Sequence, residues 1–183
     1  MKKNKKQKTQ NFSFDEEILR TNIALLIDSL RTHSRIYVMK MGMHLPQSVD
    51  SEKISTFAQR FVEKEKKDGY DAAYIVARDD NTNGNTNYQM GLILDGTKTK
   101  NASAHIDNAN KILQDVIGPE YSADGMIEKS NPGIVVNAQD IAKEKFADYD
   151  EAYRQLSLLA KDNPTAKEKG KAFFYSKMKK DSF

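Results

Sequence analysis

The sequence AAYIVARDDNTNGNTNYQMGLIL, residues 72–94, decides the fold class of this chain. Its two ends, residues 72–78 and 88–94, are rich in apolar, β-branched and aromatic residues, which favour strands. The stretch between them, DDNTNGNTN, consists of turn-forming residues around Gly84. A short turn of this kind cannot make a parallel crossover, so we predict that the two strands are antiparallel neighbours.

A strand is also predicted upstream, at residues 35–43, RIYVMKMGM. It is rich in β-forming residues and ends at His44-Leu45-Pro46, because proline lacks the backbone N–H that a strand ladder needs. Methionines alternate along this strand, and side chains two residues apart share one face. We therefore expect one side of the strand to face the core. The methionines are Met39, Met41 and Met43.

Two helices are predicted from apolar side chains that recur at helical spacing. The first covers residues 14–32 and follows a capping box, in which Ser13 and Glu16 each satisfy an unpaired amide. The second covers residues 103–117. Both have one apolar and one polar face, as expected of helices that lie on a sheet.

Another helix is predicted to begin at Asp50 or Ser51 and to end at Gly69, whose backbone freedom suits a helix end. Its apolar residues fall on one face. The charged run at residues 63–67, EKEKK, is expected to form its solvated side.

The last part of the chain is predicted to hold a short strand at residues 134–137 and a helix at residues 139–161. That helix stops before Asn163-Pro164, because the residue before proline disfavours the α region. The final stretch, residues 172–183, is compatible with a strand or a loose basic tail. The pattern predicts an α+β fold, an antiparallel sheet of roughly four or five strands with helices packed on one face.

Length and charge indicate one domain with basic ends. The 183 residues suffice for a single hydrophobic core. Residues 1–10 contain five lysines and residues 167–180 contain six, whereas residues 11–166 have 18 basic and 24 acidic residues, a net charge of −6. Overall charge therefore does not establish nucleic-acid binding. The expected parts are a disordered basic tail at 1–12, a folded domain at 13–163 and a basic extension at 164–183.

Residue content excludes several kinds of site. The chain has no cysteine, which excludes disulfides, thiolate nucleophiles and thiolate metal ligands. Its only imidazoles are His33, His44 and His105. No apolar run reaches the length of a membrane span or a signal-peptide core, so we expect a cytoplasmic protein without a membrane partner.

Residues 35–46, RIYVMKMGMHLP, carry the first of three resemblances to one family. They are similar to a strand of the rolling-circle replication initiators of inoviruses, a branch of the HUH endonucleases. In that strand, Arg and an apolar run lead to Asp-Leu-His or Asp-Leu-Arg, followed by Leu-Pro. Gly42 stands where the family usually has Asp. The resemblance spans about residues 14–177 and implies an HUH or ferredoxin-like fold.

The second resemblance is to the metal-binding hairpin of this family. Residues 87–96, NYQMGLILDG, are similar to the family's His-Tyr-His, followed by an apolar run ending in Asn-Gly. In the family the two imidazoles bind Mg²⁺ or Mn²⁺, which polarises the phosphate to be cut. Here the pair is Asn87 and Gln89, neutral amides, so we expect no metal and no other cofactor.

The third resemblance covers residues 153–161, YRQLSLLAK, which are similar to a helix of the family that ends in Ser-Tyr-Leu-Ala-Lys. That tyrosine attacks DNA and becomes linked to the 5′ phosphate. Leu158 occupies its position and has no nucleophilic atom. Tyr153 is the nearest substitute, but five helical positions rotate it by roughly 140° from Leu158, so we expect a packed aromatic side chain.

The resemblance, together with the loss of both metal ligands and the nucleophile, predicts a pseudoenzyme without catalytic residues. We expect it to bind single-stranded or hairpin DNA, at an origin, hairpin or operator, as a regulator or replication accessory of a mobile element. A replication protein of the host or phage is a further candidate partner. The candidate DNA contacts are Arg35, Lys40, Arg78, Tyr88, Arg154, Lys161, Lys169 and Lys171.

Two alternatives remain open at this point. The first is a protein-binding effector or inhibitor encoded by a phage or satellite, which the negative centre of the chain favours. The second is an active nicking endonuclease with displaced catalytic residues. His44 is either a surviving metal ligand or, as we expect, a histidine at a strand end whose nitrogens are satisfied by backbone groups. Oligomeric state does not follow from the sequence.

Overall fold

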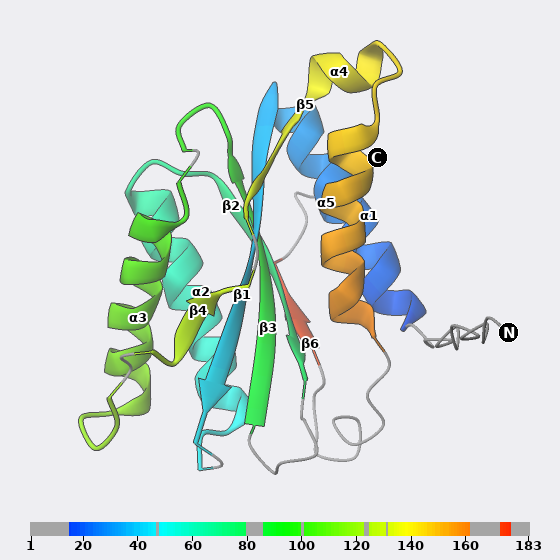
Figure 1. The fold of residues 1–183 in the computed structure, drawn as a ribbon. Coiled ribbons are helices and arrows are strands. Elements are labelled where there is room, and N and C mark those ends of the chain that lie inside the picture. Colours follow the sequence, from blue (N-terminus) through cyan, green and yellow to red (C-terminus); the bar gives the residue numbers. More distant parts are fainter. Residues whose placement is uncertain are drawn as a thin grey trace, which may run out of the picture.

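A six-stranded antiparallel sheet with helices against it forms the described part of the chain (Figure 1). The computed structural model describes residues 15–46, 48–79, 86–99, 101–122, 125–130, 132–161 and 173–176. The predicted α+β class and antiparallel sheet are confirmed. The strands are β1 (Arg35–Leu45), β2 (Ala72–Arg78), β3 (Thr86–Asp95), β4 (Ile127–Lys129), β5 (Ile134–Asn137) and β6 (Phe173–Tyr175). The helices are α1 (Glu16–Thr32), α2 (Ser51–Lys67), α3 (Ser103–Ile117), α4 (Ala138–Ala142), α5 (Ala147–Ser157) and the 3₁₀ turn η1 (Leu158–Ala160).

The order of the strands is that of a split β-α-β fold. Along the chain the central elements are β1, α2, β2, β3, α3 and β4, and in the sheet the order is β4-β1-β3-β2. The predicted hairpin is confirmed, since β2 and β3 pair antiparallel from Ala72 opposite Leu94 to Arg78 opposite Tyr88. β5 pairs with the start of β1, and β6 adds an edge strand beside β2.

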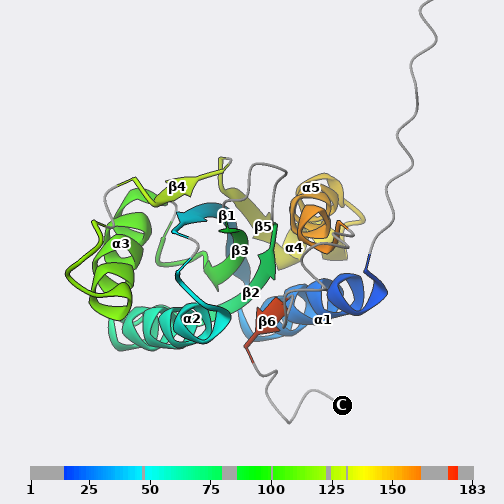
Figure 2. The same cartoon turned by 90° about the horizontal axis from the view of Figure 1, so that it is seen from below.

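Helices cover both faces of the sheet, so the expectation of helices on one face was wrong (Figure 2). α2 and α3 pack on one face and α1 and α5 on the other. The reason lies in the strands, which are apolar on both sides. Met39 faces the α2 and α3 layer, whereas its neighbour Val38 faces α1 and α5, and both are almost fully buried. A strand of this kind requires cover on both faces.

The α2 and α3 layer contains the larger core. Phe57 and Phe61 of α2 stack with ring centroids 5.8 Å apart, and both are buried. The three alternating methionines of β1 lie beneath this layer with no exposed surface, which confirms the expected core-facing side of the strand.

A close contact holds α5 against the opposite face. A Cβ atom added to Gly91 would overlap the side chain of Leu156 and lie 3.0 Å from that of Leu159. Nearby, the buried amide of Asn22 in α1 donates to the carbonyl of Leu156 over 2.9 Å. This hydrogen bond joins α1 to α5, which also pack against each other.

The helix boundaries agree with most of the sequence patterns. α3 has the predicted bounds, and Asp50 caps α2 by accepting the amide of Lys53. α1 begins two residues later than predicted. Its N-cap is Asp15, which accepts the amides of Glu17 and Ile18, whereas Ser13 lies outside the described residues.

The predicted helix at residues 139–161 is divided, and this is a second correction. α4 ends at Ala142, and the amide of Lys145 donates to the carbonyl of Asp140 in a tight turn. Glu144 in this turn has a φ of 59°, which a continuous helix does not allow. α5 then ends at Ser157, ahead of η1.

Three short strands complete the sheet. β4 was not predicted from the sequence, whereas β5 has the predicted bounds. β6 corresponds to the strand alternative for the C-terminal stretch. No helix among the described residues is long and apolar enough to cross a membrane.

Candidate nucleic-acid interface

The face of the sheet that α5 covers becomes polar toward the end of β1. Lys40, Gly42 and His44 lie on this face, and the register places Gly42 opposite Gln89 and His44 opposite Asn87 on β3. The two amide side chains, two residues apart on β3, therefore share this face. We use the name polar sheet face for Lys40, His44, Asn87, Gln89, Glu128 and Ser130.

His44 is held by two side chains. Its Nδ1 lies 2.9 Å from Oδ1 of Asn87, and its Nε2 lies 3.0 Å from Oε1 of Glu128. The hydrogen bond to Glu128, and then the bond to Asn87, raise the pKa of His44 above its usual value, although burial acts in the opposite direction. Because both partners are acceptors, they favour the imidazolium form. The partners are side chains, so the expectation of backbone partners was wrong.

Sequence reasoning missed Glu128 and Ser130, which β4 brings to this face. Glu128 lies opposite Gly42 in the register, and its carboxylate reaches His44. The hydroxyl of Ser130 donates to Oε1 of Gln89 over 3.3 Å. A Cβ atom at Gly42 would lie 3.3 Å from Ser130 Oγ, a tight contact, and 3.6 Å from the amide of Gln89, an ordinary van der Waals distance.

The residues present do not fit the metal ion that the family resemblance implies. The polar sheet face offers one carboxylate, Glu128, and one imidazole, His44, beside two neutral amides. Both imidazole nitrogens are engaged as donors when His44 is protonated, and a protonated imidazole cannot bind a metal. Among the described residues, no group of three or more His, Asp or Glu side chains is placed to hold a metal ion.

The position that the resemblance assigns to the nucleophile lies on the same side of the sheet. Leu158 follows α5 directly, and its neighbours Leu156 and Leu159 pack over Gly91 on that face. The Leu158 side chain is 46% exposed and carries no reactive atom. Tyr153 is half-buried against the α1 and α5 core, as expected for a packed aromatic.

The polar sheet face contains one lysine, Lys40, and Arg154 lies beside it. Burial lowers the pKa of Lys40 below its ordinary value; Asp79 opposes this shift and Arg154 adds to it. Arg154 is exposed on α5 and donates two hydrogen bonds to Glu151, each 2.6 Å long. Those bonds, followed by the bond from Gln155, lower the pKa of Glu151 to about 2. The Lys40 and Arg154 side chains are thus close enough at this end of α5 for the positive charge of Arg154 to lower the pKa of Lys40.

Other predicted DNA contacts lie elsewhere. Tyr88 is completely buried on the α2 and α3 side, so its ring is closed to a base, and Arg78 lies over that ring at 5.9 Å. Arg35 is at the opposite end of β1, roughly 30 Å from His44 along the strand, where its Nε donates to the carbonyl of Gly96. The structure therefore does not bring Arg35, Arg78 and Tyr88 together with Lys40.

Among the lysines near the C-terminus, Lys161 is exposed directly after η1. Lys169 and Lys171 lie outside the described residues.

An aromatic surface that the sequence did not reveal lies at the edge of the same face. Phe173 and Tyr175 of β6 stack with centroids 5.7 Å apart and planes at 16°. They pair with Ala77 and Ile75 of β2, which face α1 and α5. Tyr175 is 41% exposed, so its ring is accessible to solvent. An exposed ring is suited to stacking a nucleobase.

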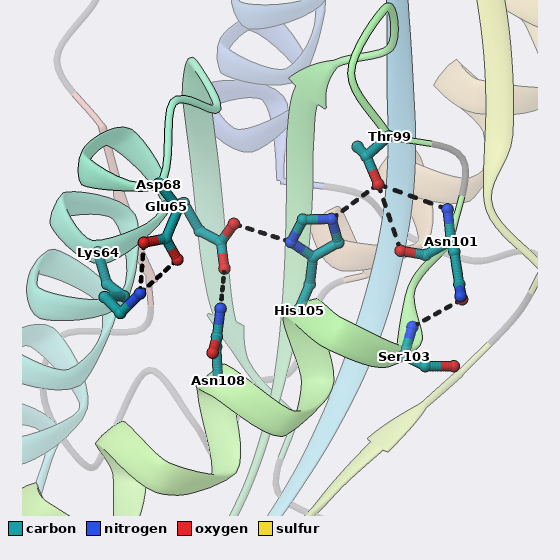
Figure 3. Close-up of polar contacts among 8 residues, drawn as sticks. All are labelled: Lys64, Glu65, Asp68, Thr99, Asn101, Ser103, His105 and Asn108. Carbon is teal, nitrogen blue, oxygen red and sulfur yellow. Dashed lines mark hydrogen bonds and ion pairs between the residues drawn. The ribbon is translucent and has the colours of Figure 1, made fainter.

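A buried polar chain on the other face was also missed by the sequence analysis (Figure 3). His105 Nδ1 lies 2.8 Å from Oε2 of Glu65, and His105 Nε2 lies 2.9 Å from the hydroxyl of Thr99. Asn108 donates to the other oxygen of Glu65. Glu65 was expected on the solvated side of α2, and this was wrong, because His105 and Asn108 of α3 supply its partners. This chain of hydrogen bonds joins α2, α3 and the segment after β3.

Glu65, His105 and Thr99 form a hydrogen-bonded series of carboxylate, imidazole and hydroxyl, the order found in catalytic triads. The cluster is nevertheless closed to solvent. The side chains of His105 and Glu65 are 2% and 0% exposed, and Thr99 is also buried. Asn101 accepts the amide of Ser103 at the start of α3 and lies within hydrogen-bond distance of Thr99. We therefore assign this cluster to the packing of α2 and α3.

Comparison with known proteins returned no family model, no curated protein and no solved structure that matches this chain.

Proposed function

We propose that this protein binds single-stranded or hairpin DNA without cutting it, through the polar sheet face, as a cytoplasmic regulator or replication accessory of a mobile element. The observation that carries the proposal is that Lys40, His44, Asn87 and Gln89 project from one face of the sheet, beside Arg154. The resemblance to rolling-circle initiators in residues 35–46, 87–96 and 153–161 supplies the class of ligand.

Several groups on this face have a counterpart in a nucleic acid. Lys40 is a cation suited to phosphate oxygens, and pairing with His44 offsets the negative charge of Glu128 on the same face. The amide of Gln89 can donate to and accept from base edges, since it carries both functions, whereas Asn87 is buried and holds His44 in place. Tyr175 adds a ring at the edge of the same face. Phosphate contacts give affinity without sequence preference, and the Gln89 amide and the ring favour unpaired bases.

The same groups argue against cleavage. Transesterification requires a nucleophile and stabilisation of the charge that develops on the phosphate. Leu158 supplies no nucleophile, and His44 with Glu128 does not fit a metal ion. We therefore expect no covalent protein–DNA product.

The test is a binding titration of the full chain on single-stranded, hairpin and duplex DNA across a salt series. We expect the unpaired forms to bind more tightly than the duplex. Affinity should fall by about tenfold or more between roughly 50 and 200 mM salt, because phosphate binding releases counterions. Lys40→Gln should weaken binding to every form and reduce the salt dependence by roughly one released ion.

The matched control is Lys111→Gln, which removes an exposed lysine from α3 on the opposite side of the sheet. This variant should bind as the unchanged protein does. If no DNA form binds at about 50 mM salt, the proposal is wrong and a protein partner becomes the better candidate. Nicking of a labelled substrate when Mn²⁺ is added would instead support the displaced-residue endonuclease.

A further inference from the structure

His44 and Glu128, here called the charge pair, lie where the polar sheet face meets the edge strand β4. β1 carries His44, and β4, which pairs with β1, carries Glu128. Nε2 of His44 lies 3.0 Å from Oε1 of Glu128, and the two side chains are 52% and 65% exposed. Because the pair is open to solvent, its net charge acts on any ligand that binds the face.

The net charge of the pair depends on the protonation of His44. An imidazolium offsets the carboxylate of Glu128, whereas a neutral imidazole leaves the pair with one negative charge. Oε1 of Glu128 and Oδ1 of Asn87 both accept hydrogen bonds from the imidazolium, and a neutral ring can donate to only one of them. Those bonds, that of Glu128 first, raise the pKa of His44 above its ordinary value of about 6.5.

The carboxylate of this pair lies near the lysine of the polar sheet face. Glu128 stands opposite Gly42, two residues along β1 from Lys40. Strand geometry then separates the Cα atoms of Lys40 and Glu128 by roughly 8 Å. This is within the screening length of about 10 Å at 0.1 M salt, so an uncompensated Glu128 repels a phosphate that contacts Lys40.

The other charged groups on the surrounding strands do not take over the role of His44. Asp79 follows β2, where its amide donates to the carbonyl of Asn87, and its carboxylate acts on Lys40. β3 contributes only the neutral Asn87 to the contacts of the ring. Among the described charged residues, Glu128 is the one that acts on the charge of His44, and His44 is its ion-pair partner.

We propose that the charge pair makes DNA binding dependent on pH, because His44 must be protonated to cancel the charge of Glu128 beside Lys40. This inference rests on the proposed function of the polar sheet face. His44 acts through Glu128 and does not itself contact phosphate. The favourable state exists below the folded pKa of His44 and is lost as pH rises through it. Affinity should then fall by about threefold or more at roughly 50 mM salt, because the face loses one net positive charge.

Titrations of the full chain with single-stranded DNA at constant salt, from about pH 6 to pH 8, measure this effect. His44→Gln should remove the dependence on pH. Glu128→Gln should bind more tightly than the unchanged protein at about pH 8, because no uncompensated carboxylate remains. The matched control is His33→Gln, since His33 bonds Asp71 at the far end of the sheet, and it should keep the dependence.

Nuclear magnetic resonance gives a second readout that a purely structural role of His44 would not produce. Binding and protonation are coupled reciprocally, so bound DNA should raise the pKa of His44. The ring signals of the three histidines are titrated with and without DNA. His44→Gln identifies the signal of His44, and the pKa values of His33 and His105 should not change.

Three outcomes would overturn the role of the charge pair and leave DNA binding itself intact. They are equal affinity across the pH range, an undiminished dependence on pH in His44→Gln, and a pKa of His44 that DNA does not change. Glu128→Gln that binds no more tightly at high pH would also contradict it, once circular dichroism shows that the variant is folded. Absence of DNA binding at every pH would overturn both this inference and the proposed function.

Discussion

His105 of α3 and Glu65 of α2 lie 2.8 Å apart, between Nδ1 and Oε2, with both side chains buried from solvent. Truncation of Glu65 to alanine leaves the donors of His105 and Asn108 without an acceptor. We expect Glu65→Ala to lower the free energy of unfolding by about 3 kcal/mol. Urea denaturation followed by circular dichroism measures it.

Glu63→Ala is the matched control, since Glu63 is an exposed glutamate on the same helix. Its effect should stay within about 0.5 kcal/mol. Equal effects of the two substitutions would show that the buried pair contributes little.

The contact of Gly91 with α5 predicts a coupled pair of substitutions. Gly91→Ala should destabilise the protein by about 1–3 kcal/mol, because the added methyl group overlaps Leu156. Leu156→Ala should cost about 2–5 kcal/mol through the cavity that it leaves. The double variant should lose less than the sum, since each change relieves the other. Additive losses in denaturant titrations would mean that α5 moves away independently of residue 91.

The environment of His44 predicts a dependence of stability on pH. Glu128, and then Asn87, raise the pKa of His44 above its unfolded value. A raised pKa stabilises the fold below the unfolded value of about 6.5, and this contribution is lost as pH rises through the folded pKa. The effect should be small, since the His44 side chain is 52% exposed and solvent weakens the pair.

Unfolding titrations between about pH 6 and pH 8 measure this loss. The dependence should shrink in Glu128→Gln, which removes the largest cause of the shift, and disappear in His44→Gln. An undiminished dependence in His44→Gln would assign the titration to another group.

The exposed ring of Tyr175 predicts a preference for unpaired bases. Tyr175→Ala should weaken binding to single-stranded DNA by about tenfold, because a stacking platform is lost. Binding to duplex DNA should change little. Tyr175→Phe keeps the ring and should keep the affinity. Titrations with labelled oligonucleotides compare the variants, and equal losses for Ala and Phe would assign the effect to the hydroxyl group.

Local patterns predicted most of the elements correctly. The hairpin of β2 and β3 and the bounds of α3 and β5 follow from side-chain periodicity and turn residues, which act over a few residues. The coverage of both sheet faces was not predicted, although Val38 and Met39 already show apolar residues on both sides of β1. A continuous apolar run in this strand was the available signal.

The missed parts of the site depend on contacts between distant segments. Glu128 reaches His44 across 84 residues, and Glu65 meets His105 across 40. In the sequence, Glu65 is one charge in a charged run, but it lies four residues after Phe61 and so on the apolar face of the helix, whereas Glu63 lies on the opposite face. That spacing was the available local signal. β4 has three residues, too few for a periodic signal. Tertiary packing, rather than local propensity, determines these positions.

The bond from Asn22 to Leu156 spans 134 residues and has a consequence for synthesis of the chain. α1 is translated well before α5, which forms part of its cover. Until then the nascent chain exposes the inner face of α1, including Ile18 and Leu25, which is apolar and prone to aggregate. We therefore expect chains arrested before α5 to depend on chaperones that bind apolar helices, whereas released chains do not.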